Sequence, residues 1–258
     1  MSESPRHWFS SDSVDNPTVR LLIFPYAGGG TAAFRSWIPG LPSSVGLTRS
    51  LLPGREDRLL DSPYNNLDLL VADLLSNIVS ILDRPFALFG HSMGALIAYE
   101  LARQLSSAGQ RSPSLLMVSA HRAPHLPDRR RPVHKLSDTA LIDELSRYSG
   151  THPDVLANEE LLSLVLPTFR SDLELCETYQ WRPARRLHCP ILVLGGIDDE
   201  NTMLELEQWR EHTTESCTIK LFPGGHFFLD SARTAVLSTI SDALLAVTAG
   251  QAGESRAR

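Results

Sequence analysis

Short apolar runs bounded by turn-forming residues recur along the chain. They are rich in Val, Ile, Leu and Phe and comprise residues Val19 to Phe24, Phe86 to Phe89, Ser114 to Ser119, Ile191 to Leu194 and Thr218 to Phe222. Continuous apolar runs of this length are typical of strands that are covered on both faces. The pattern therefore predicts five buried strands.

Stretches with a helical pattern lie between these runs. They are residues Asp68 to Leu82, Ala95 to Leu105, Met203 to His212 and Ala232 to Ala246. Strands that alternate with helices in this way predict an α/β domain with a mostly parallel sheet and crossover helices on both faces. In such sheets ligands bind at the carboxyl ends of the strands, so we expect the functional residues at that edge.

One segment is much longer than a single crossover helix requires. Residues 121–186 separate the third and fourth predicted strands and contain two further helical patterns, Asp138 to Tyr148 and Glu159 to Tyr179. Because the segment leaves the carboxyl end of a strand, it must overhang the functional edge, and we expect it to act as a lid. A helical pair without a gating role is the alternative.

The composition is that of a soluble globular protein. Of the 258 residues, 42% are hydrophobic and 21% are charged, and no apolar run approaches the roughly 20 residues that cross a bilayer. We expect one domain over residues 19–249, an N-terminal extension over 1–18 and a disordered tail over 250–258. The polar N-terminal segment resembles neither a secretory signal nor a transit peptide, so we expect a cytoplasmic protein.

Charge and cysteine content exclude several classes of partner. A formal net charge of -6 gives no general attraction to nucleic acid. The three cysteines, Cys176, Cys189 and Cys217, are odd in number and widely spaced, which argues against both a disulfide framework and a zinc site. We therefore expect them to be buried small apolar residues and expect no metal or other cofactor.

The strongest chemical signal is the sequence Gly-His-Ser-Met-Gly at residues 90–94. It directly follows the predicted strand Phe86 to Phe89 and directly precedes a predicted helix. This context is that of a nucleophile elbow, in which a strained turn projects the serine hydroxyl at the strand end. We therefore predict that Ser92 is the nucleophile of an α/β-hydrolase; a serine N-cap in an ordinary glycine-rich turn is the alternative.

A serine nucleophile needs a base and an orienting carboxylate, in the chain order Ser, acid, His. Of the nine histidines, His226 follows the last predicted strand through Pro-Gly-Gly and lies at the same sheet edge as Ser92. The acid should follow the strand Ile191 to Leu194, where Asp198 and Asp199 are adjacent. We favour Asp199 from its position after the last glycine of this loop, and Asp198 remains open.

An oxyanion hole requires two backbone N–H groups. Met93, directly after the nucleophile, supplies one. We expect Ala27 to supply the other, because the first predicted strand runs into Pro-Tyr-Ala-Gly-Gly-Gly at residues 25–30, where glycines allow a substrate to approach closely.

Several motifs together resemble one family. FPYAGGG, LPGRED, GHSMGALIAYELAR, SAHRAPH and FPGGHFFL are similar to motifs of the type II thioesterases that serve polyketide synthases and nonribosomal peptide synthetases. The resemblance extends from about Val19 to Leu245 and implies a triad of Ser92, Asp199 and His226. It also implies that the substrate is an acyl group on the phosphopantetheine arm of a carrier protein, removed when it is stalled or misprimed. One departure is Asp199-Glu200, where the family often has Asp-Pro.

Three alternatives remain at this point: a small-molecule carboxylesterase, a thioesterase domain of a larger synthase, and an inactive binding protein on the same fold. The dense basic run Arg129, Arg130 and Arg131 opens the predicted lid, with Arg122 just before it. Carrier proteins of this kind are acidic, as the resemblance implies, so these arginines are candidates for steering the partner. A solvated charge run without such a role is equally compatible with the sequence.

Overall fold

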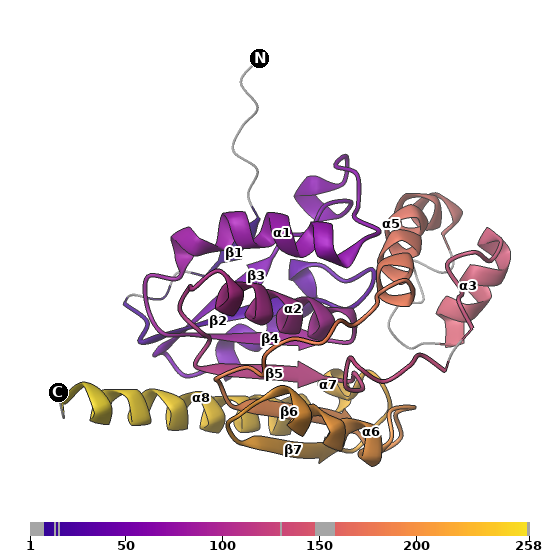
Figure 1. The fold of residues 1–258 in the computed structure, drawn as a ribbon. Coiled ribbons are helices and arrows are strands. Elements are labelled where there is room, and N and C mark those ends of the chain that lie inside the picture. Colours follow the sequence, from indigo (N-terminus) through magenta and orange to yellow (C-terminus); the bar gives the residue numbers. More distant parts are fainter. Residues whose placement is uncertain (1–7, 13, 15, 130, 148–157, 257–258) are drawn as a thin grey trace.

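The computed structural model describes residues 8–12, 14, 16–129, 131–147 and 158–256. Within these residues the sheet has seven strands in the order β1-β3-β2-β4-β5-β6-β7 (Figure 1). All neighbouring strands are parallel except β1, which runs antiparallel to β3. The strands are β1 (Phe9–Ser11), β2 (Val19–Phe24), β3 (Val45–Ser50), β4 (Phe86–His91), β5 (Leu115–Ser119), β6 (Ile191–Gly196) and β7 (Cys217–Phe222). The predicted mostly parallel α/β sheet is confirmed.

Helices cover both faces of this sheet. One face packs against α1 (Leu67–Ile78), α2 (Met93–Ser107), α6 (Met203–Glu207) and the 3₁₀ helix at Gln208–His212. The other face packs against the 3₁₀ helix at Thr31–Gly40, α7 (Phe228–Ser231) and α8 (Arg233–Arg256). Two shorter 3₁₀ turns, Glu56–Arg58 and Val79–Ile81, complete these elements. β2, β4, β5 and β6 are almost entirely buried, which explains their continuous apolar runs. β1 and β7 lie at the two edges of the sheet and are partly exposed.

Two strands have no counterpart in the sequence prediction. All six residues of β3 are buried although its sequence, VGLTRS, includes polar residues. The guanidinium of Arg49 is buried because it donates to Asp12 over 2.8 Å and to the carbonyl of Thr31 over 3.1 Å. β1 lies within the predicted extension 1–18, so the sheet begins before Val19, the predicted start of the domain.

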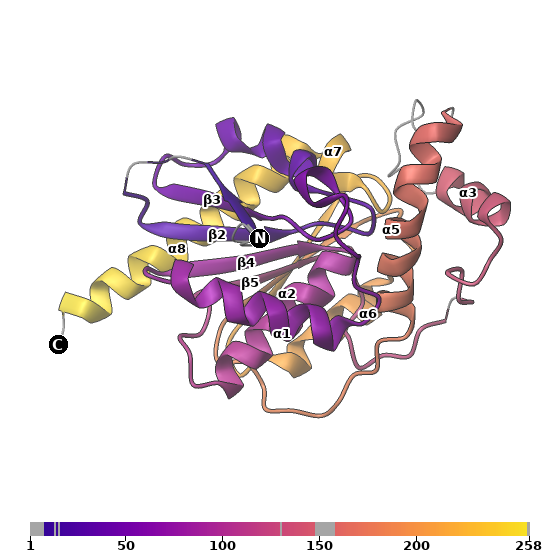
Figure 2. The ribbon, with the colours of Figure 1, turned by 90° about the horizontal axis from the view of Figure 1, so that it is seen from above.

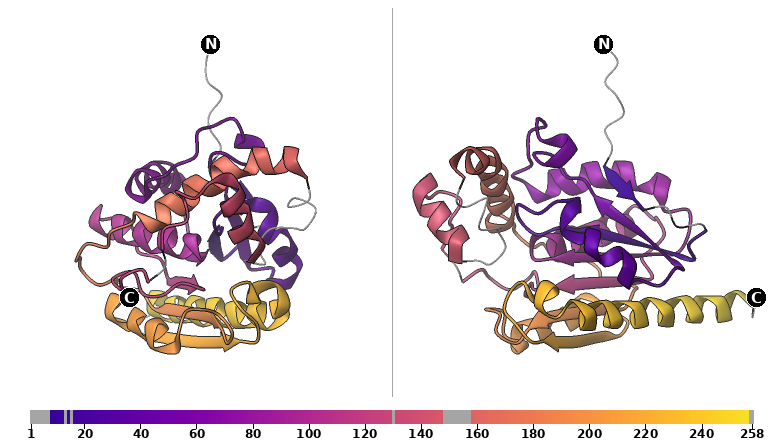
Figure 3. Two further views of the ribbon diagram at one scale, coloured as in Figure 1. Left: turned by 90° about the vertical axis from the view of Figure 1, so that its right-hand side faces the viewer. Right: turned by 180° about the vertical axis from the view of Figure 1, so that it is seen from behind.

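The expected lid, residues 121–186, contains α3 (Asp138–Arg147) and α5 (Glu159–Glu177). Both helices lie beyond the carboxyl ends of the strands (Figures 1 and 2), and they stand in front of that sheet edge in Figure 3, left. Leu141, Leu145 and Leu166 form a small apolar core between the two helices. Tyr148, the predicted end of the first lid helix, lies outside the described residues.

The C-terminal helix differs from the prediction. Its residues continue as α8 through Arg256, whereas a disordered tail was expected from Gly250. The segment contains Ala, Gln, Glu and Arg and no proline, and each of its two glycines, Gly250 and Gly253, costs a helix only about 1 kcal/mol relative to alanine. Among the described residues no helix is long and apolar enough to span a membrane.

Candidate active site

Ser92 occupies a strained position between β4 and α2. Its φ and ψ are 55° and -116°, a conformation that costs a non-glycine residue about 1–3 kcal/mol. The turn is held by two backbone hydrogen bonds, from the N–H of Ser92 to the carbonyl of Ser119 over 2.8 Å and from the N–H of Ala95 to the carbonyl of Ser92 over 2.9 Å. This is the backbone of a nucleophile elbow, with Ser92 at the N-terminus of α2.

The two glycines of the motif are required by close backbone contacts. A Cβ on Gly90 would lie 1.8 Å from the carbonyl oxygen of Gly94, and one on Gly94 would lie 2.1 Å from the carbonyl oxygen of Phe24. The start of α2 therefore lies directly against the end of β2. This packing brings the elbow next to the loop that follows β2.

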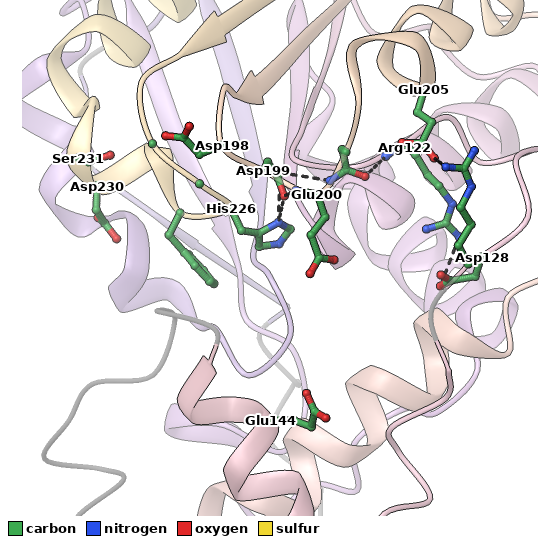
Figure 4. A pocket seen from close by; sticks show the side chains of 15 residues that line it. Arg122, Asp128, Glu144, Asp198, Asp199, Glu200, Glu205, His226, Asp230 and Ser231 are labelled. Atoms are coloured by element: carbon green, nitrogen blue, oxygen red, sulfur yellow. Dashed lines mark hydrogen bonds and ion pairs between the residues drawn. The ribbon is translucent and has the colours of Figure 1, made fainter.

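Asp199, rather than Asp198, contacts His226. Nδ1 of His226 lies 3.1 Å from Oδ1 and 3.3 Å from Oδ2 of Asp199. The side chain of Asp199 is only 2% exposed, whereas Asp198 is exposed and points away from the imidazole (Figure 4). The two loops are fixed to each other by a hydrogen bond of 3.0 Å from the N–H of Asp198 to the carbonyl of Gly224.

The environment of Asp199 keeps its carboxylate ionised. Burial by itself raises the pKa of a carboxyl group, but the hydrogen bonds from His226, Asn201 and the N–H of Glu200 outweigh it, so the pKa of Asp199 is lowered. The side-chain amide of Asn201 donates to Asp199 over 3.2 Å and to the carbonyl of Ala120 over 3.3 Å. Asn201 thus connects the acid to the first residues after β5.

His226 lies beside the elbow without a hydrogen bond between its ring and the Ser92 hydroxyl within the described chain. Its ring centroid is 5.3 Å from that of His91, the residue that precedes Ser92. Complete burial, with the nearby charge of His226, lowers the pKa of His91 well below its usual value. Serine and base often come within hydrogen-bonding distance only when a substrate is bound.

The loop after β2 forms a tight turn. The N–H of Gly29 donates to the carbonyl of Tyr26 over 2.8 Å, and Gly28 has a φ of +75°, which is the geometry of a type II turn with Ala27 and Gly28 in the centre. Within the described residues, the backbone N–H groups of Ala27 and Met93 donate to no protein acceptor. The role of these two groups as oxyanion-hole donors stays a prediction.

A cavity of about 860 Å³ opens beside the Asp199–His226 pair (Figure 4). The body of the protein lines it with the two loops that carry these residues, and the lid lines it with Arg122, Arg129 and Glu144. The lid therefore forms a wall of the cavity, as expected.

The basic run at the start of the lid is partly neutralised. Arg129 is 3.4 Å from Glu205 and Arg131 is 3.0 Å from Glu144, and their side chains remain 76% and 72% exposed. Arg122 lies 3.3 Å from Asp128, and Arg130 lies outside the described residues. Arg129 and Arg131 are therefore exposed near the cavity, but each is paired with a carboxylate.

The cysteines agree only in part with the expectation of burial. Cys189 is buried, which raises the pKa of its thiol to about 12, whereas Cys176 and Cys217 are half-buried. No group of three or more His, Cys, Asp or Glu side chains among the described residues is arranged to hold a metal ion.

Sequence reasoning did not identify three residues that shape the site. Asn201 positions Asp199, and Arg55 and Asp172 bind the loop that carries Ala27. Arg55 belongs to the motif LPGRED, from which the sequence alone predicts no role for this residue. Asp172 is a lid residue that no motif includes.

Comparison with known proteins identifies the family of the chain. The model of the thioesterase domain family matches residues 19–244. The chain is 38% identical to the gramicidin S biosynthesis protein GrsT of Aneurinibacillus migulanus over 86% of this chain and 88% of that protein. It is also 38% identical to the thioesterase PikA5 of Streptomyces venezuelae, over 91% and 84% of the two chains. The solved structure of the type II thioesterase BorB from the borrelidin biosynthetic cluster superposes with a TM-score of 0.85 at 38% identity, covering 92% of this chain and 97% of that one. The chain therefore belongs to the thioesterase family, and within it to the type II thioesterases on the α/β-hydrolase fold.

Proposed function

We propose that this protein hydrolyses acyl thioesters carried on the phosphopantetheine arm of a carrier protein, with Ser92, His226 and Asp199 as its catalytic triad. The observation that carries the proposal is the contact of His226 with the buried Asp199 carboxylate beside the strained Ser92 elbow. The family membership supports a thioester as the bond that is cleaved.

The proposed reaction has two stages. The Ser92 hydroxyl attacks the thioester carbonyl while Nε2 of His226 takes its proton, and the N–H groups of Ala27 and Met93 stabilise the oxyanion. Collapse of the tetrahedral intermediate breaks the C–S bond and leaves an acyl-serine, and the sulfur takes the proton from His226 and departs as the thiol. Water then attacks the acyl-serine with His226 again as base, which releases the carboxylic acid and restores Ser92.

The side chains and backbone N–H groups of the protein suffice for this reaction, so we propose that it requires no metal or other cofactor. A thiol with a pKa of about 8.5 is a good leaving group and needs little protonation as it departs. The Asp199 carboxylate fixes the Nδ1–H tautomer of His226 and stabilises the imidazolium that forms.

We further propose that the partner belongs to an assembly line that makes a polyketide or a nonribosomal peptide, where the enzyme removes stalled or misprimed acyl groups. This extends to the present chain what the names of GrsT and BorB say of those proteins. We expect it to act in the cytoplasm, a reducing compartment in which thiols such as those of Cys189 and Cys217 persist.

The experiment that tests the function compares an acyl-carrier protein with a simple oxoester of the same acyl chain. We expect kcat/KM to be much higher for the carrier-bound thioester, and expect Ser92→Ala to abolish turnover of both substrates. Equal or faster turnover of the oxoester would favour a small-molecule carboxylesterase. A wild-type protein whose Ser92 is not labelled by a fluorophosphonate would instead be an inactive binding protein.

A further inference from the structure

One face of the lid helix α5 is packed against the glycine loops of the body. Thr168 and Asp172, one turn apart, are 6% and 3% exposed. The hydroxyl of Thr168 donates to the carbonyl of Gly54 over 2.6 Å. The ring of Phe169 packs against Gly28 so closely that a Cβ on this glycine would lie 2.9 Å from the ring. The lid is thus in direct contact with the loop of residues 25–30, which we call the oxyanion loop.

The carboxylate of Asp172 joins the lid to this loop. Its Oδ2 accepts the backbone N–H of Gly28 over 2.7 Å, and its Oδ1 accepts Nη2 of Arg55 over 2.8 Å. The side chains of Asp172 and Arg55 are 4% and 8% exposed. A buried carboxylate with two donors is a strong, directional contact, because hydrogen bonds to an ionised group are shorter and stronger than neutral ones.

Arg55 also binds this loop directly. Its Nη1 donates to the carbonyl of Gly29 over 2.8 Å, and its Nε donates to the carbonyl of Pro53 over 3.3 Å. The neighbouring Glu56 accepts the N–H groups of Thr31 and Ala32, each over 2.9 Å. The oxyanion loop and the residues that follow it are therefore held by side chains rather than by the sheet.

These contacts decide the orientation of one peptide group. The bond between Ala27 and Gly28 is the central peptide of the Tyr26–Gly29 turn, and type I and type II turns differ by a flip of this peptide. In the observed type II form the N–H of Gly28 points at Asp172. Without that acceptor Gly28 can also adopt a negative φ, because glycine occupies both regions. The flip changes the backbone conformation of Ala27, the residue whose N–H is the proposed oxyanion donor.

We propose that Asp172 and Arg55 are positioning residues, through which the lid helix α5 holds the oxyanion loop in its catalytic conformation. This proposal rests on the proposed function, in which the N–H of Ala27 stabilises the oxyanion. The lid then does more than enclose the substrate, because the oxyanion hole is complete only when α5 is seated on the loop.

The most informative variant is Asp172→Asn. The side chain keeps its size, but it faces two donors, Gly28 N–H and Arg55, and an amide has only one acceptor oxygen. One donor is therefore left opposite an NH₂ group. We expect kcat for an acyl thioester to fall by about 10-fold to 100-fold, since removal of an entire oxyanion donor costs 10²–10³-fold, with KM changed less than threefold.

Glu177→Gln is the matched control. Glu177 lies on the same helix, has a side chain that is 12% exposed, and also accepts backbone N–H groups, those of Val133 and His134, together with the His134 side chain. All of its partners are within the lid. We expect this variant to lower the melting temperature as Asp172→Asn does, while kcat stays within about twofold of the wild type.

A transition-state analogue separates positioning from loss of stability. A trifluoromethyl ketone forms a tetrahedral adduct whose oxyanion occupies the hole, so its affinity should fall in Asp172→Asn by the same factor as kcat and should be unchanged in Glu177→Gln. The proposal is overturned if both variants lose kcat and inhibitor affinity equally, well below their melting temperatures. If Asp172→Asn does not fold, Arg55→Lys, which keeps the charge but loses the forked donors, carries the same expectation.

A readout without turnover distinguishes this proposal from the proposed function. The Gly28 amide should exchange its hydrogen slowly in the wild type and in Glu177→Gln, and at least 10-fold faster in Asp172→Asn. If the wild type hydrolyses no acyl thioester, the proposed function fails, and the exchange of Gly28 still decides whether the lid holds the loop. Unchanged exchange in Asp172→Asn overturns the coupling whatever the activity.

Discussion

The change from Asp199 to Asn tests the acid of the triad most directly. At a separation of 3.1 Å between Nδ1 of His226 and Oδ1 of Asp199, and with an effective dielectric constant of about 20, the attraction between imidazolium and carboxylate is about 5 kcal/mol. This attraction exists only once His226 has taken the Ser92 proton. Its loss therefore raises the barrier, and at 1.36 kcal/mol for each factor of ten it corresponds to about three to four powers of ten in kcat.

The assay follows thiol release from an acyl thioester under saturating substrate. Asp198→Asn is the control, because it makes the same chemical change at the neighbouring, exposed position, and we expect its kcat to remain within about threefold of the wild type. Melting temperatures measured alongside check that both variants are folded. An Asp199→Asn enzyme within 10-fold of the wild type refutes the reasoning, and a greater loss in Asp198→Asn transfers the role to that residue.

Three other predictions concern the elbow, a buried histidine and the basic run. Ser92→Gly relieves the φ of 55°, so we expect urea unfolding to show a gain of about 1 kcal/mol together with loss of catalysis; no gain would mean that the elbow is unstrained. Burial and the nearby His125 lower the pKa of His212 to about 4, so the unfolded state binds the proton first as the pH falls below 6.5. Stability should therefore drop by about 2 kcal/mol between pH 7 and pH 5, and His212→Gln should flatten this dependence; an unchanged slope would contradict the assignment. Replacing Arg129 and Arg131 with Ser should raise KM for acyl-carrier protein and weaken its salt dependence. Turnover of a small acyl thioester should stay the same, and an equal response of both substrates would exclude steering.

The parts of the fold that the sequence predicts are those in which burial and sequence pattern agree. Four of the five apolar runs, β2, β4, β5 and β6, are strands with both faces covered, and the fifth, β7, is a partly exposed edge strand. β3 could not be predicted in this way, because the burial of its Arg49 requires hydrogen bonds to Asp12 and Thr31. A pattern of apolar and polar positions along the chain does not indicate such partners.

The candidate site follows the same division. The elbow at Ser92 is a local motif, so its strained geometry could be predicted from neighbouring residues. The choice between Asp198 and Asp199 depends on how two loops dock, which the structure shows through the contact of Asp198 with Gly224. The bond from Gly28 to Asp172 joins residues 144 positions apart, and no local pattern indicates it.

The short strand β1 has a practical consequence for work with this protein. It pairs along the outer edge of β3, and Trp8 just before it is 7% exposed and accepts a hydrogen bond of 2.8 Å from the N–H of Leu51. A chain shortened to begin at Val19, where the family match starts, would uncover the unpaired backbone of β3. Exposed edges of this kind recruit strands from other molecules, so such a shortened chain should aggregate during expression even though every residue of the triad is present.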